Sequence, residues 1–145
     1  MAKKQDKHGD ILVIGDTQVT PTAPVHHLQA LARYIWKNQP DTVVHIGDNW
    51  DFESLSSYSS PLEREGRRLH VDIVSGAHAL EIIPNYLKAK NQKMKGKVFK
   101  PNLQFVPGNH EDRLNRFINS HPELAGYIDL EEIIKMAGWT YNEYL

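Results

Sequence analysis

Three short apolar runs, each followed by a glycine and then by a polar side chain, constrain the fold of this 145-residue chain more than any other feature. The runs occupy residues 11–14, 42–46 and 103–106, and the turns that follow them contain Gly15-Asp16, Gly47-Asp48 and Gly108-Asn109. Short apolar runs that end in turn residues are typical of buried strands.

The segments between and after these runs are predicted to be helical, over residues 25–39, 63–90, 111–119 and 129–137. Pro84 falls inside the second segment, so that helix should kink or break there. Residues 139–145 alternate like a strand, with nothing after them to pair with. Because strands alternate with helices, we expect an α/β fold with a mainly parallel sheet and covering helices. Residues 10–145 should form one domain after a polar tail over residues 1–9.

Composition excludes several classes of protein. Lys and Arg number 17 and Asp and Glu 18, which argues against a strongly basic nucleic-acid wrapper and an acidic disordered tail. The sequence has no cysteine, so disulfide scaffolds, thiolate zinc sites and cysteine nucleophiles are excluded, and a metal must bind through oxygen or imidazole nitrogen. No apolar run approaches the roughly 18 residues of a membrane span, and the N-terminus has no secretory signal. We therefore expect a cytoplasmic protein without membrane contact.

The polar residues after the three runs are expected to form a site. If the strands are parallel neighbours, Asp16, Asp48 and Asn109 emerge together at the carboxyl edge of the sheet, where open α/β sheets bind ligands. Each glycine would allow a tight exit and close approach of a ligand. Gly-Asp is also common turn chemistry, but three such exits in one small domain favour a site. Asp16 and Gln18 lie two residues apart and can reach the same ion.

The ordered set Asp16-Thr17-Gln18, Gly47 to Asp51 and Gly108 to Glu111 resembles the calcineurin-like metallophosphoesterases. Their signature is D-x-H, then GD-x-x-D, then GNH-[DE], and the wording around the motifs is most similar to phage-encoded members. The resemblance covers roughly residues 10–113. It implies the N-terminal half of the family's β-sandwich α/β fold and, for a phage protein, a place in the host cytoplasm.

The resemblance also implies a mechanism with two divalent metal ions. Asp16 would bind the first ion, Asp48 would bridge both and Asn109 would bind the second, while a metal-activated hydroxide attacks phosphorus. His110 would protonate the leaving oxygen or stabilise the charge that develops there. Asp51 would accept the other imidazole N–H, unless it only caps its loop.

Two departures from the family pattern affect the expected metal site. Gln18 stands where the family usually has histidine, which favours Mn²⁺ over Zn²⁺, with Mg, Fe or Ni as further alternatives, unless Gln18 only binds a water. The later G-H-x-H motif is also missing. The site would then be completed by a second chain or a second copy in a homo-oligomer, or the chain would be an incomplete half-domain that binds metal weakly and acts through a partner. His26 and His27 open the first helix near that edge, where a surface role is favoured over coordination, and His45 is expected to be a hydrogen-bonded core residue.

Substrate hints come from residues beside the motifs. Protein phosphatases of the family carry arginine after the second motif, whereas this chain has Phe52, which argues against a phosphoprotein substrate. Arg113 and Arg116 follow His110 and are expected either to contact phosphate or to face solvent. Six lysines between residues 88 and 100 form either a nucleic-acid contact or a solvated loop. The loop over residues 50–62 should adjoin the site. We expect a phosphoesterase hydrolase, of phosphodiesterase or nuclease-like type.

Overall fold

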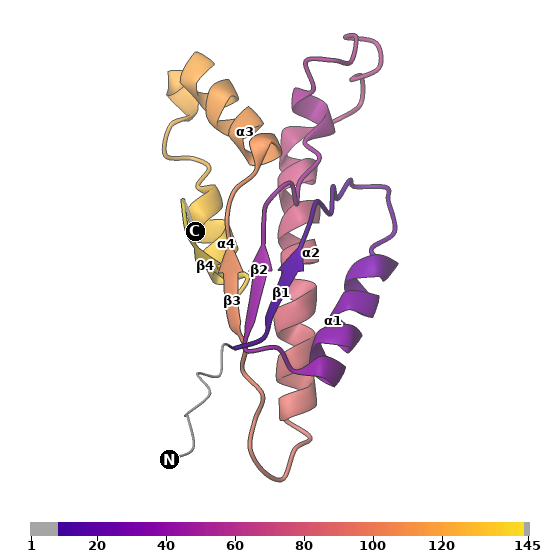
Figure 1. Ribbon diagram of the computed structural model, residues 1–145. Coiled ribbons are helices and arrows are strands. Elements are labelled where there is room, and N and C mark those ends of the chain that lie inside the picture. The colour runs from indigo at the N-terminus through magenta and orange to yellow at the C-terminus, as the bar shows by residue number, and fades with distance from the viewer. Residues whose placement is uncertain (1–8, 144–145) are drawn as a thin grey trace.

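The computed structural model describes residues 9–143, in which helices cover one face of a four-stranded parallel sheet (Figure 1). The sheet has the order β1-β2-β3-β4, and every neighbouring pair is parallel. The elements in chain order are β1 (Ile11–Ile14), α1 (His26–Asn38), β2 (Thr42–His45), η1 (Glu53–Leu55), α2 (Leu69–Asn91), β3 (Asn102–Phe105), α3 (Asn109–Ser120), η2 (Pro122–Leu124), α4 (Leu130–Met136) and β4 (Thr140–Tyr141). The α/β fold with a mainly parallel sheet is thus confirmed.

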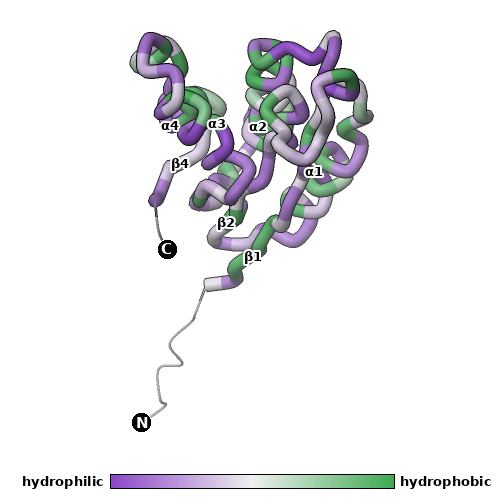
Figure 2. Tube along the Cα trace, turned by 90° about the horizontal axis from the view of Figure 1, so that it is seen from above, coloured by the Kyte–Doolittle hydropathy of each residue, from purple (hydrophilic) through white to green (hydrophobic). Residues whose placement is uncertain are grey.

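The helices cover one face of the sheet. Because the strand order never reverses, right-handed crossovers place successive helices on the same side, and the view onto the carboxyl edge shows them there (Figure 2). The core between helices and sheet contains Ile35, Val43, Leu80, Phe105 and Ile134. The opposite face of the sheet is uncovered: Ile11 is 67% exposed and Val13 57% exposed.

Pro84 does not interrupt α2, which runs continuously from residue 69 to 91. The prediction of a break was wrong, and the reason lies in tertiary structure. Proline has no N–H to donate to the carbonyl of Leu80, four residues earlier. The indole N–H of Trp139 donates to that carbonyl instead, at 2.9 Å. The lost helical hydrogen bond is therefore replaced from another part of the chain.

Three predicted boundaries also need correction. α2 begins at Leu69 rather than at residue 63, because residues 61–66 form turns in which Gly66 adopts a φ of +82°. α3 begins at Asn109, so Asn109 and His110 lie on the first turn of a helix. β4 does have a partner, since it pairs with β3 at the edge of the sheet. The tail over residues 1–8 and the last two residues lie outside the described part of the chain.

Within residues 9–143, none of the helices combines the length and the apolar character needed to cross a bilayer.

Candidate metal and phosphate site

Asp48 joins the three loops that leave β1, β2 and β3. Its carbonyl oxygen accepts hydrogen bonds from the backbone N–H groups of Thr17 at 3.2 Å and Gln18 at 2.9 Å. Its side-chain Oδ1 accepts a hydrogen bond from the backbone N–H of His110 at 2.7 Å. Asp48 is 8% exposed, so this carboxylate lies at the base of the carboxyl edge. The structure therefore brings the three motif loops into direct contact around one residue.

Two of the three glycines are required by this contact. A Cβ atom on Gly47 would lie 2.1 Å from the nitrogen of Gly108, and a Cβ on Gly108 would lie 2.3 Å from Asp48 Oδ1. Gly47 also has a φ of +86°, which favours glycine. Gly15 has no such role, because a Cβ there would meet nothing within 4 Å. The expectation that each glycine allows close approach of a ligand stays a prediction.

Backbone strain is concentrated in the same loops. Gln18, Asp48 and Phe52 adopt φ values of 41°, 51° and 48°, in the left-handed region that non-glycine residues rarely occupy. Conformations of this kind persist where surrounding contacts enforce them, and they cluster at functional sites. At Gln18 and Asp48 the enforcing contacts are the backbone hydrogen bonds from residues 17 and 18 to Asp48.

Glu111 holds the loop after β2 in place, a role that the sequence reasoning missed. One carboxylate oxygen accepts the N–H groups of Asn49 at 2.9 Å and Trp50 at 3.4 Å. The other accepts the N–H groups of Asp48 at 2.8 Å and Gly108 at 2.7 Å. Burial raises the pKa of Glu111, while the four N–H donors oppose that rise. The only signal in the sequence was the acidic fourth position of the third motif.

His45 belongs to a buried chain of hydrogen bonds, as expected for a core histidine. The N–H of Gly47 donates to its Nδ1 at 3.2 Å, so the ring proton is on Nε2. Nε2–H then donates to Thr17 Oγ1 at 3.2 Å, and that hydroxyl donates to Asn49 Oδ1 at 3.2 Å. Asn49 Nδ2 completes the chain by donating to the carbonyl of Gly76 in α2 at 3.1 Å. This network ties the first two motif loops to the helix layer.

His110, Asp51 and Arg113 form a second cluster above Asp48. His110 Nδ1 lies 3.2 Å from Asp51 Oδ1, although the contact lacks hydrogen-bond alignment and Nδ1 has no other partner among the described residues. Arg113 Nη1 donates to the carbonyl of Asp51 at 2.8 Å, and Arg113 Nη2 lies 2.9 Å from His110 Nε2. A guanidinium can only donate, so Nε2 accepts and the ring proton is on Nδ1, facing Asp51. Arg113 thus holds both the histidine and the loop of Asp51.

The donor atoms at this edge fit a hard divalent cation. Asp16 and Gln18 are exposed beside Asp48, and Asn109 lies on the first turn of α3. Two carboxylates and two amide oxygens match the ligands that Mn²⁺ and Mg²⁺ accept. Across residues 9–143, however, no group of three or more His, Asp or Glu side chains lies close enough together to hold a metal. The donors therefore fit a partial site rather than a full pair of ions.

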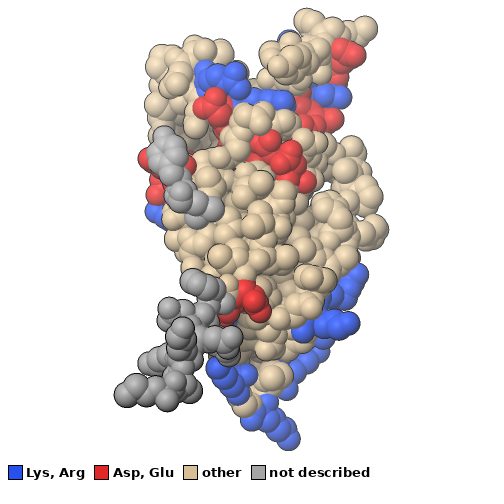
Figure 3. All heavy atoms as spheres, viewed as in Figure 1, with Lys and Arg blue, Asp and Glu red and all other residues tan. Residues whose placement is uncertain are grey.

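Other residues considered from the sequence lie apart from this edge or are engaged elsewhere. His26 and His27 are exposed in the first turn of α1. Phe52 is buried and stacks on Trp50 with ring centroids 5.8 Å apart, so it belongs to the core. Arg116 is exposed and pairs with Asp112 at 3.0 Å. The lysines between residues 88 and 100 lie in the last turn of α2 and in the loop that leads to the amino end of β3. Basic groups gather at this end of the molecule, opposite the candidate site (Figure 3).

Comparison with known proteins places these loops in a family. A model of the family described as Calcineurin-like phosphoesterase matches residues 9–143. The chain is 44% identical over 55 residues to the Gene 54 protein of Mycobacterium phage L5, an alignment that covers 38% of this chain and 21% of that protein. It is 29% identical over 135 residues to the Gene 54 protein of Mycobacterium phage D29, which covers 89% of this chain and 48% of that protein.

The chain thus spans about half the length, or less, of the curated relatives it matches. No solved structure matches it. The family match covers all the described residues and includes the three loops that meet at Asp48. The chain therefore belongs to the calcineurin-like phosphoesterase family.

Proposed function

We propose that this chain carries the catalytic edge of a divalent-metal-dependent phosphodiesterase of nuclease-like type. The observation that supports this most is the position of Asp48, whose carbonyl and carboxylate join the loops of all three motifs. A carboxylate at such a junction can reach ligands held by either neighbouring loop. The phage relatives favour the host cytoplasm as the place of action.

Asp16, Gln18, Asp48 and Asn109 would hold the metal, with Mn²⁺ as the expected ion. When bound, divalent ions in such sites lower the pKa of a bound water and neutralise phosphate charge. Asp48 Oδ1 is engaged by the N–H of His110, so Oδ2 is the oxygen available for an ion. The same hydrogen bond fixes the position of α3 relative to the metal-binding edge.

His110 would transfer a proton to the leaving oxygen, with Asp51 and Arg113 as positioning residues. Arg113 now donates to Nε2 of His110, and its guanidinium can equally donate to a phosphate oxygen. A phosphate that accepts those N–H groups would release Nε2, which would first take up a proton from water and then pass it to the leaving oxygen. Asp51, 3.2 Å from Nδ1, would stabilise the imidazolium form during this exchange.

The experiment is Mn²⁺-dependent hydrolysis of bis-p-nitrophenyl phosphate, compared with the monoester p-nitrophenyl phosphate. Asp48→Asn keeps an acceptor for the N–H of His110 but removes the charge, so we expect kcat/KM to fall at least a hundredfold. Asp41→Asn is the matched control, because Asp41 lies at the amino end of the same strand. Equal activity of Asp48→Asn and wild type would overturn the proposal.

A second function is favoured by the small number of side chains that could bind a metal ion. The described residues hold no group of three His, Asp or Glu side chains suited to a metal, so the chain could bind one ion weakly and act through a partner chain or a second copy that completes the site. Titration with Mn²⁺ by calorimetry separates the two. Tight binding of two ions per chain supports a complete site, whereas weak binding of one ion without turnover supports the partner-dependent function.

A further inference from the structure

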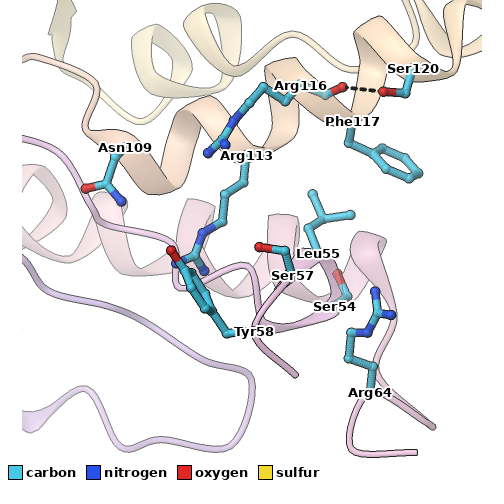
Figure 4. Close-up of a pocket in the computed structure, with 10 residues that line it drawn as sticks. All are labelled: Ser54, Leu55, Ser57, Tyr58, Arg64, Asn109, Arg113, Arg116, Phe117 and Ser120. Carbon is cyan, nitrogen blue, oxygen red and sulfur yellow. Dashed lines mark hydrogen bonds between the residues drawn. The ribbon is translucent and has the colours of Figure 1, made fainter. Parts of the chain in front are cut away.

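A hollow of about 340 Å³ lies beside the candidate catalytic edge, between α3 and the loop over residues 54–64 (Figure 4). In that view Arg113 reaches down from α3 and Arg64 reaches up from the loop. We call this hollow the arginine pocket, after the three arginines that line it: Arg64, Arg113 and Arg116. Ser54, Ser57 and Ser120 also line it, and no aspartate or glutamate does. Its size is that of a small-ligand site, and its chemistry is that of an anion site.

Two polar groups in the wall of the pocket are left without partners. Arg64 Nε and Ser54 Oγ are both buried, and neither has a hydrogen-bond partner among the described residues. A buried donor without an acceptor is unfavourable, because it loses its bonds to water and gains none. An anion in the pocket would be attracted by the positive charge of Arg64, whichever of the guanidinium nitrogens it meets.

The remaining arginines are placed to accept the same ligand. Within residues 9–143 Arg116 pairs only with Asp112, and both side chains are more than half exposed, so this pair is weak and easily exchanged. Arg113 is 17% exposed and fixed by the carbonyl of Asp51. Its guanidinium therefore presents a preorganised donor rather than a mobile one.

The arginine pocket is continuous with the catalytic edge. Asn109, one of the proposed metal ligands, is also part of the pocket wall. Arg113 lines the pocket while its Nη2 lies 2.9 Å from His110 Nε2. A ligand in the pocket would therefore lie next to the phosphate that reacts, on the leaving-group side. The ring of Tyr58, 92% exposed, stands at the rim, where a base or sugar could rest.

We infer that the arginine pocket binds a second phosphate group of the substrate, and that Arg64 determines this specificity. This inference rests on the proposed function. The preferred substrates are phosphodiesters that carry another phosphate next to the scissile one. Such a phosphate is either the next one along a nucleic-acid strand or a terminal phosphate on a short nucleotide.

The first test is binding, which does not depend on turnover. Calorimetry with thymidine 3′,5′-bisphosphate and thymidine 5′-monophosphate should show at least tenfold tighter binding of the bisphosphate. Arg64→Gln should reduce this preference about tenfold while leaving binding of the monophosphate unchanged. Arg33→Gln, an equal charge change on the exposed surface of α1, should leave both affinities unchanged. Equal affinity for the two ligands, or an equal effect of Arg33→Gln and Arg64→Gln, would overturn the inference.

The second test separates the sources of the phosphate. The KM for hydrolysis is measured with Mn²⁺ for three thymidine substrates. An unphosphorylated dinucleotide is the reference, and it is compared with a dinucleotide that carries a 5′-phosphate and with an unphosphorylated trinucleotide. A lower KM for the 5′-phosphorylated dinucleotide alone supports recognition of a terminal phosphate. A lower KM for that dinucleotide and for the trinucleotide supports recognition of the next phosphate along a strand. Equal KM values for all three substrates contradict the proposed role of the arginine pocket. Arg64→Gln should abolish the advantage without changing hydrolysis of bis-p-nitrophenyl phosphate. If the bisphosphate binds as predicted but no diester is hydrolysed, the proposed function is wrong, whereas phosphate binding by the arginine pocket is supported.

Discussion

Glu111 is the residue on which the geometry of the second motif depends. Its two oxygens accept four backbone N–H groups, three of them from residues 48–50. Bonds from N–H groups to a carboxylate are stronger than bonds between neutral groups, and their loss leaves buried donors unpaired. A single side chain on α3 thus shapes the loop that presents Asp48.

Glu111→Gln should therefore destabilise the chain strongly. The glutamine NH₂ group cannot accept hydrogen bonds, so the backbone N–H groups that now donate to one carboxylate oxygen would lose their acceptor. We expect a loss of about 2–4 kcal/mol in the free energy of unfolding. Urea unfolding followed by tryptophan fluorescence measures this loss. Glu123→Gln, at an exposed site, should change stability by less than about 0.5 kcal/mol. Equal stability of the two variants would contradict the role given to Glu111.

His45 should make stability depend on pH. Burial lowers the pKa of His45 to about 4, although the nearby charge of Asp16 opposes that shift. Between pH 6.5 and 4 the unfolded chain binds a proton that the folded chain does not, so stability falls as the pH falls. The contribution of His45 approaches about 3 kcal/mol over this window, at 1.36 kcal/mol per pKa unit.

The measurement is urea unfolding between pH 4 and pH 7. His45→Asn cannot titrate, so its stability should depend less on pH than that of the wild type, whatever its stability at pH 7. His70→Gln changes an exposed histidine at the start of α2 and should keep the wild-type slope. The same slope in His45→Asn and the wild type would show that His45 takes up its proton in the folded chain over the same pH range as in the unfolded chain.

At the scale of elements, α2 shows how a helix accepts an internal proline. Pro84 leaves the Leu80 carbonyl without its helical donor, and the indole of Trp139 replaces that donor. Trp139 directly precedes β4 and is buried, so the same hydrogen bond fixes the last strand against the helix layer. The proline and the tryptophan are therefore coupled, although 55 positions separate them in the sequence.

A double-mutant cycle tests this coupling. Trp139→Phe alone should lower the free energy of unfolding by about 2–4 kcal/mol, since it shrinks a buried ring and leaves the Leu80 carbonyl unpaired. In a Pro84→Ala background the alanine N–H can donate to the Leu80 carbonyl. Trp139→Phe should then lower the free energy of unfolding by about 1 kcal/mol less than it does in the wild type. Additive effects of the two substitutions in urea unfolding would contradict the coupling.

At the scale of the whole molecule, one face of the sheet is left uncovered. Ile11 and Val13 on β1 are more than half exposed, and Ile46 just after β2 is 47% exposed. An apolar face of this kind usually marks an interaction surface. It lies on the side of the sheet away from the helices, so a partner there would leave the arginine pocket and the carboxyl edge open.

We propose that this face can pair with a second copy of the chain, and on this proposal Val13→Lys should reduce self-association. A charge in the middle of the uncovered face opposes its burial against a second copy, so the sedimentation coefficient should shift toward the monomer value at the same concentration. Tyr34→Lys is the matched control, because Tyr34 is 53% exposed on α1, away from that face. An equal shift in both variants would show that net charge, rather than the sheet face, controls association.

Much of the fold and the outline of the site were predictable from the sequence. The three strands, the helix between the first two and the parallel sheet follow from apolar runs and spacing, because such patterns depend on near neighbours along the chain. The motif loops were predictable for the same reason, since parallel strands bring their carboxyl ends to one edge. These features needed no knowledge of which side chains meet.

Tertiary structure alone decided what holds the site together and what lies beside it. Glu111 contacts the second motif loop and Trp139 contacts the carbonyl beneath Pro84, and in both pairs the residues are far apart in sequence. Arg64 and Arg113 are also far apart in sequence and line the same hollow. No local pattern encodes such contacts, because they depend on how elements pack and on which buried polar groups find partners. The sequence by itself determined the elements and the donor loops, and the packing decided their geometry, the unbroken α2 and the arginine pocket.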